Sequence, residues 1–162
     1  MKRFLLLAML MFSSMLLHAK TGLGIQGGIR FTPSPEGCFG ITGRSESSPW
    51  GVEISYDFRE ESINLVLDNW WIYKRINSNL NWFALWGLSF GGRLKNEAYL
   101  DTGSRVGIGL NAFCFESRCL ELYAQAAWNP TVGIDFDRDR KKYSVRATPA
   151  CFPVNAGIRF WL

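Results

Sequence analysis

Four cysteines carry the most reactive side chains in the sequence: Cys38, Cys114, Cys119 and Cys151. An even number of cysteines is compatible with disulfides, and four of them allow three different pairings. No CxxC motif occurs, so the spacing supports neither a redox centre nor a zinc site. Their chemistry therefore depends on whether the chain is exported and on which elements bring them together.

The single histidine, His18, lies in a segment typical of a secretory signal peptide. Two cations are followed there by an apolar run over residues 4–17 and then by small residues. The run is shorter than the ~20 apolar residues of a spanning helix, which disfavours the alternative of a retained membrane anchor. We expect residues 1–19 to be a cleaved signal peptide and residues 20–162 to form one domain.

Loss of this leader would leave no histidine in the mature chain. Histidine-based catalytic triads and zinc sites with histidine ligands are then excluded. The net charge of +4 comes partly from the two cations of the leader, so it gives no argument for nucleic-acid binding. We expect no enzyme activity, no catalytic residue, no metal and no cofactor.

Alternation of apolar side chains with polar residues or glycine dominates the rest of the chain. Val106, Ile108 and Leu110, for example, alternate with glycines and polar residues, as in a strand with one apolar face. Asn69 interrupts the apolar face of the fourth segment, which fits the pattern least well. Eight segments are predicted to be strands: 21–31, 37–44, 51–58, 63–73, 81–93, 105–115, 120–129 and 154–162.

The connections between these strands alternate in length. The turns RSESSPW, NSN and ESR are short, whereas the connections on the opposite side include LKNEAYLDTG and the long stretch from Pro130 to Pro153. This asymmetry is typical of bacterial outer-membrane barrels, and an up-and-down order places the last strand beside the first. We therefore predict an all-β fold, an eight-stranded antiparallel up-and-down transmembrane β-barrel.

The size of the side chains indicates which face points outward. Rings such as those of Tyr73, Trp86 and Trp128 lie on the apolar faces and are too many for the interior of eight strands, so we expect them outside. The opposite faces carry glycines and charges of both signs, which must pair in a narrow lumen. The alternative is an exposed polar face whose ion pairs contribute little. The predicted lumen charge network consists of Arg30, Glu53, Asp57, Asp68, Arg93, Arg105, Glu121 and Arg159.

With strands assigned, two disulfides become the favoured pairing. Cys114 and Cys119 flank one short turn, and Cys38 and Cys151 open the second and eighth strands at the external rim. Free thiols and other pairings remain as alternatives.

The longest connection contains a basic cluster: Arg138, Arg140, Lys141, Lys142 and Arg146. On an external loop it would suit anionic lipid head groups, glycans or host proteins, and a merely solvated loop is the alternative. Aspartates alternate nearby, but the glycine and terminal glutamate of a calcium loop are missing.

The ending PVNAGIRFWL resembles the terminal signature that the assembly machinery of outer-membrane barrels recognises. The stretches TGLGIQGGIRF and GITGRSESSPWGVEISYDF look most like the small barrel proteins of spirochaetes. Nearly all of the mature chain is similar to the small eight-stranded barrels of the group of outer-membrane proteins A, X and W. The resemblance implies a fold and a location in the outer membrane of a diderm bacterium, and no activity.

Three functions follow as hypotheses. The first is a non-catalytic outer-membrane protein, a monomer in contact with outer-membrane lipid, serving envelope structure or binding a host or envelope ligand through external loops. The second is a narrow channel or conduit for small apolar solutes. The third, a barrel enzyme acting on lipids, is disfavoured because the known outer-membrane palmitoyltransferases and deacylases of similar size use histidine. A soluble lipocalin-like periplasmic carrier is the alternative fold.

Overall fold

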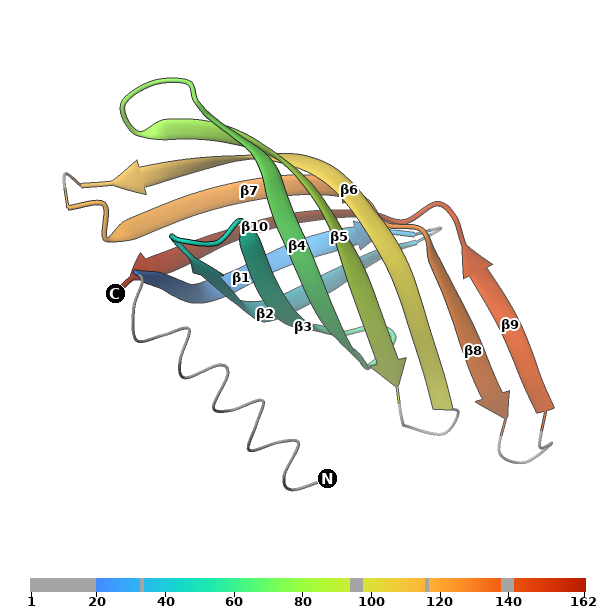
Figure 1. The fold of residues 1–162 in the computed structure, drawn as a ribbon. Helices are drawn as coiled ribbons and strands as arrows, with labels where there is room; N and C mark the ends of the chain where they lie inside the picture. Colours follow the sequence, from blue (N-terminus) through green and yellow to red (C-terminus); the bar gives the residue numbers. More distant parts are fainter. Residues whose placement is uncertain (1–19, 33, 94–97, 116, 138–141) are drawn as a thin grey trace.

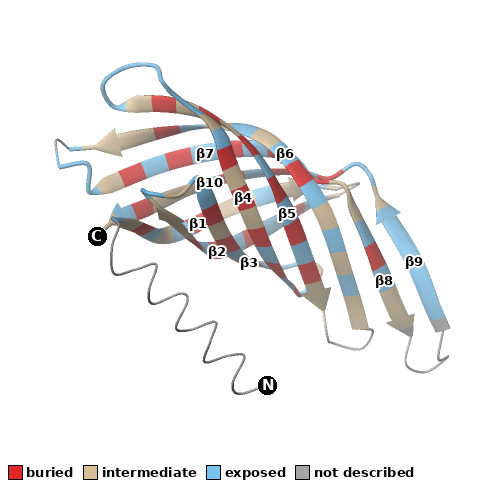
Figure 2. Ribbon diagram, viewed as in Figure 1, coloured by how far each residue is buried: buried red, intermediate tan, exposed pale blue. Residues whose placement is uncertain are grey.

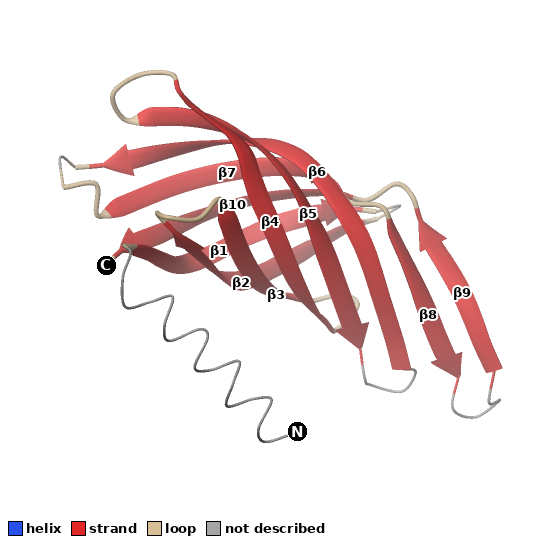
Figure 3. Cartoon of the chain, viewed as in Figure 1, coloured by secondary structure: helices blue, strands red, loops and turns tan. Residues whose placement is uncertain are grey.

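The computed structural model describes residues 20–32, 34–93, 98–115, 117–137 and 142–162. Strands and their connections make up this part of the chain (Figure 3), and no helix in it is long and apolar enough to cross a membrane. The predicted signal peptide lies outside the described residues. The strands are β1 (Thr21–Phe31), β2 (Pro35–Ser45), β3 (Trp50–Asp57), β4 (Ser62–Arg75), β5 (Leu80–Arg93), β6 (Ala98–Cys114), β7 (Leu120–Trp128), β8 (Thr131–Asp137), β9 (Lys142–Thr148) and β10 (Phe152–Trp161).

Eight of these strands close into an antiparallel barrel (Figure 1). They follow the order β5-β4-β3-β2-β1-β10-β7-β6, and pairing between β5 and β6 completes the ring. The last strand pairs with the first, with Leu23 opposite Phe160 and Phe31 opposite Phe152. The apolar ending of the sequence is thus a closing strand. The predicted eight-stranded antiparallel up-and-down barrel is confirmed as the fold.

Buried and exposed residues alternate along the strands of the barrel (Figure 2), and charged and polar side chains are prominent among the buried ones while large apolar side chains are exposed outside. Trp86 and Trp128 are 44% and 49% exposed, whereas Arg159 is 4% exposed. Rings such as those of Trp86 and Trp128 lie outside, as the size of the aromatic side chains predicted. Outward-facing apolar side chains occur on strands all around the barrel, among them Leu23, Ile25, Ile41, Ile54, Leu65, Leu88, Phe90, Ile108, Leu122, Val154 and Phe160.

A β-bulge in β4 changes which residues face the interior. The register between β4 and β5 shifts between Asn69 and Ile72, so Trp70 points inward before the bulge and Tyr73 points inward after it, opposite Phe83. The expectation that Tyr73 shares the outer face was wrong, because one extra residue reverses the alternation of period two. The same bulge turns Ile72 outward.

A hairpin of β8 and β9 extends one wall beyond the barrel (Figure 1). The strand β8 pairs with the first part of β6, Ala98 opposite Phe136 and Gly103 opposite Thr131. The prediction of an irregular external loop was therefore wrong for residues 131–137 and 142–148. The stretch TVGIDFD alternates like the other strands, and that signal was hidden by the run of charges that follows it.

Candidate functional site

The barrel interior holds the charged residues that the sequence places on the inner faces. Six of the eight predicted residues form three ion pairs of opposite charge. These pairs are Arg30 with Asp57 at 2.6 Å, Arg105 with Asp68 at 3.1 Å and Arg159 with Glu121 at 3.4 Å. Each acid lies on a different strand from its base: Arg159 and Glu121 are direct partners on the adjacent strands β10 and β7, and the other two pairs each bridge one intervening strand along the inner wall.

The other two predicted residues have partners that the sequence did not indicate. Glu53 is buried and accepts a hydrogen bond from Asn155 Nδ2 at 3.3 Å. Arg93 pairs with Glu60 at 2.8 Å near the loop end of the barrel, where both side chains are partly exposed. Arg93 therefore belongs to the rim rather than to the buried network.

Glu121 is the centre of the network near the short turns. Its side chain is fully buried, and its carboxylate accepts hydrogen bonds from Asn111 Nδ2 at 2.7 Å and from Trp161 Nε1 at 3.0 Å. Besides Arg159, Arg44 approaches it to 3.9 Å. Two guanidinium groups thus share one buried carboxylate, which makes its charge important for stability.

Aromatic rings fill the lumen around these two arginines. The Arg44 guanidinium lies 4.0 Å from the centre of the Trp70 ring, and that of Arg159 lies 3.8 Å from the centre of the Tyr123 ring. Trp70 stacks on Phe83 with ring centres 3.5 Å apart. Cations over aromatic faces are attracted by the ring quadrupole, more strongly when water is excluded. The stack occupies the end of the barrel where the turns are short.

Glycines make room for the rings that face inward. Phe83, Tyr123 and Trp161 pair directly with Gly109, Gly157 and Gly22 on neighbouring strands. A Cβ at Gly157 would meet Tyr123 Cε1 at 2.6 Å, closer than real Cβ atoms come. Glycine in a strand often marks such a close approach, and the rings cover the backbone that glycine leaves bare. The glycine-rich inner faces therefore follow from the crowding of the lumen.

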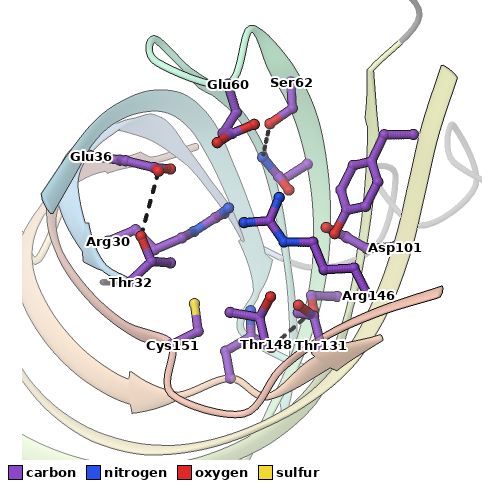
Figure 4. A pocket seen from close by; sticks show the side chains of 14 residues that line it. Arg30, Thr32, Glu36, Glu60, Ser62, Asp101, Thr131, Arg146, Thr148 and Cys151 are labelled. Atoms are coloured by element: carbon purple, nitrogen blue, oxygen red, sulfur yellow. Dashed lines mark hydrogen bonds between the residues drawn. The ribbon is translucent and has the colours of Figure 1, made fainter. Parts of the chain in front are cut away.

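A small polar cavity opens at the other end, where the connections are longer. Its volume is about 60 Å³. Figure 4 shows Arg30 and Arg146 pointing into it, with Glu36, Glu60 and Asp101 on its wall. A polar cavity of this size has room for a few water molecules.

Tyr99 belongs to the wall that β6 and β8 build beyond the barrel. Burial and the neighbouring Asp101 carboxylate raise the pKa of its phenol above the usual range. The ring covers Gly133 of β8. Tyr99 therefore stays neutral at any physiological pH and acts as a packing residue with a polar tip.

The four cysteines are free thiols in the structure, so neither predicted disulfide is present. Cys114 pairs with Leu120, which places Cys119 one residue out of register and on the opposite face. Cys38 and Cys151 are both buried, but Cys38 is two strands away from Asn155 and Cys151 lies four residues before Asn155, so strand spacings put the two Cα atoms about 16 Å apart. Disulfides need Cα atoms within ~7 Å.

The basic cluster is only partly described. Residues 138–141, which include Arg138, Arg140 and Lys141, lie outside the described residues. Lys142 begins β9, and Arg146 lies within the same strand. Within the described part of the chain, no group of three or more His, Cys, Asp or Glu side chains could hold a metal ion.

No family model and no curated protein matches this chain. Among solved structures, the chain is similar to a major outer membrane protein from Thermus thermophilus, at 12% sequence identity and a TM-score of 0.45. The match covers 88% of this chain and 99% of that chain. A likeness this low carries no argument, so the resemblance to outer-membrane proteins A, X and W and to spirochaetal barrels stays a prediction.

Proposed function

We propose that this chain is a non-catalytic integral β-barrel protein of a bacterial outer membrane. The observation that carries the proposal is the inverted burial: ion pairs such as Arg105 with Asp68 lie inside, and side chains such as Ile41 and Ile108 are 58% and 65% exposed outside. Soluble monomers rarely expose apolar patches beyond a few hundred Å², whereas this surface is apolar on every strand of the ring. An apolar outer surface of this extent is stable in contact with the hydrocarbon core of a bilayer.

Strand lengths support the same proposal. A tilted strand crosses a bilayer with about 9–11 residues, and β1 has 11 while β10 has 10. A closed barrel satisfies every backbone group between strands, which is required where no water is available. A soluble carrier would need its apolar face inside, and the inner face here carries the charges instead.

The filled lumen favours a structural or surface role over transport. The stack of Arg44 on Trp70 and of Trp70 on Phe83 occupies the turn end, and a small polar cavity opens at the loop end. Neither region suits an aqueous pore or an apolar solute. The longer loop end, with the β8–β9 hairpin, is therefore the part that we assign to contacts outside the membrane.

Fractionation of cells that express the full chain tests this proposal. We expect the protein in the outer-membrane pellet, released by detergent and not by salt or carbonate, and migrating differently on gels before and after heating. Recovery in the soluble fraction without detergent would overturn the proposal and favour the soluble carrier.

A further inference from the structure

The outer edge of β9 has no partner strand within the described residues. In the sheet order β9 is terminal, and its pairing runs only along β8, from Lys142 opposite Asp137 to Thr148 opposite Thr131. Figure 1 shows no strand on its other side. Every second residue of an edge strand points its backbone N–H and C=O groups away from the sheet. The outer edge of β9 therefore presents a row of hydrogen-bond donors and acceptors.

The two faces of β9 differ in chemistry. Tyr143 and Val145 lie on the outer face and are each 75% exposed. Ser144 and Arg146 lie on the opposite face, and Arg146 points into the polar cavity (Figure 4). No described acid forms an ion pair with Arg146. A strand added to this edge would thus meet an apolar row on one side and an unpaired cation on the other.

We propose that the free edge of β9 binds an extended segment of another protein in which apolar residues alternate with acidic ones. Backbone hydrogen bonds along the edge would give affinity, and alternate side chains would give specificity. The apolar residues would extend the row of Tyr143 and Val145, while an acid on the other face would reach Arg146. The proposal rests on the proposed function, which places this hairpin outside the membrane.

A second copy of the chain fits the edge less well. Full-length antiparallel pairing of two β9 strands would centre on Val145 and set Ser144 of one copy opposite Arg146 of the other. The two Arg146 side chains would then share one face as diagonal neighbours, about 7–8 Å apart, and neither copy would supply an acid from β9. Like charges at this position disfavour the homodimer and favour an acidic partner.

Binding of designed peptides to the full chain in zwitterionic detergent micelles tests the proposal. The probe is a fluorescein-labelled heptapeptide of alternating valine and glutamate, with empty micelles as the blank. Its first control replaces glutamate by lysine, and its second is N-methylated at alternate residues so that it cannot pair along one edge. We expect the glutamate peptide to bind at least fivefold more tightly than either control.

Charge reversal at the edge gives the specific readout. Arg146→Glu should weaken binding of the glutamate peptide about fivefold and strengthen binding of the lysine peptide by a similar factor. Arg75→Glu makes the same charge change at the exposed end of β4, on the opposite rim, and should leave both affinities unchanged. Heat-modifiable migration of each variant shows that the barrel has folded.

Equal binding of the N-methylated peptide, or equal effects of the two variants, would overturn the proposal. So would a concentration-dependent dimer of the chain that is abolished by Val145→Lys, because the second copy would then be the occupant. Peptide binding is measured on folded protein in micelles, whereas the membrane assignment is measured by cell fractionation. Failure of one is therefore distinguishable from failure of the other.

Discussion

Replacing Glu121 by glutamine should destabilise the barrel far more than any comparable change at the rim. The Glu121 carboxylate is fully buried and lies 3.4 Å from Arg159 and 3.9 Å from Arg44. Glutamine keeps the shape and its carbonyl oxygen can still accept the hydrogen bond of Asn111. Its amide nitrogen replaces the oxygen that accepts from Trp161 and Arg159, so the substitution removes the charge and one acceptor. Two buried guanidinium groups then lose their only shared carboxylate among the described residues.

Removal of one partner from a buried pair typically costs about 3–5 kcal/mol. Neither arginine is in ideal bidentate geometry, so we expect a loss near the lower end, about 3 kcal/mol. The matched control is Glu60→Gln, which removes the partner of Arg93 in a pair whose side chains are 23% and 38% exposed. Exposed pairs contribute about 0–1 kcal/mol, so this variant should unfold almost like the wild type.

Urea unfolding in lipid vesicles, followed by tryptophan emission, measures both variants. Midpoints should shift while the slopes stay equal, since the surface exposed on unfolding is the same. Adding Arg159→Met to Glu121→Gln should recover part of the loss, because one uncompensated charge is removed with it. A loss below about 1 kcal/mol for Glu121→Gln, or one equal to that of Glu60→Gln, would refute the idea of a dry, paired lumen.

Three further expectations follow from the geometry. Protein purified without reductant and then denatured should react with thiol reagent at all 4 cysteines, and labelling of fewer would show that a bridge forms after all. Gly157→Ala forces the Tyr123 ring to move and should cost about 1–3 kcal/mol, whereas Gly27→Ala, where the nearest atom is 3.7 Å from the new Cβ, should be nearly neutral in the same urea titration. In planar bilayers the purified chain should show no porin-like conductance, and steady large openings would mean that the stack of rings in the lumen is not a permanent plug.

The sequence predicted the fold because period-two alternation persists through most of the barrel. Residues 21–31 were predicted with the bounds that β1 has, and the terminal strand was predicted to close the ring. The same alternation showed which charged residues face the interior. Their partners could not, because pairing across a lumen depends on register and barrel shear, which are set by all strands together.

The errors have physical causes of their own. The bulge at Asn69 to Ile72 adds one residue, and no local pattern distinguishes it from an imperfect strand. Phe83 is an apolar residue on a mostly polar inner face, and its pairing with Gly109 on the neighbouring strand gives its ring room. The β8–β9 hairpin was missed because charges at its tip made an alternating segment look like a solvated loop.

Quenching of tryptophan by brominated lipid acyl chains tests most directly whether the apolar face meets hydrocarbon. Variants that keep one of the 7 tryptophans, with phenylalanine at the others, are reconstituted into vesicles. Trp86 and Trp128 are exposed on the outside, and Trp70 is 4% exposed within the lumen. Strong quenching of Trp86 and Trp128 with little quenching of Trp70 is the expected result. Quenching of Trp70 alone, or of none of the three, would contradict the membrane-spanning barrel.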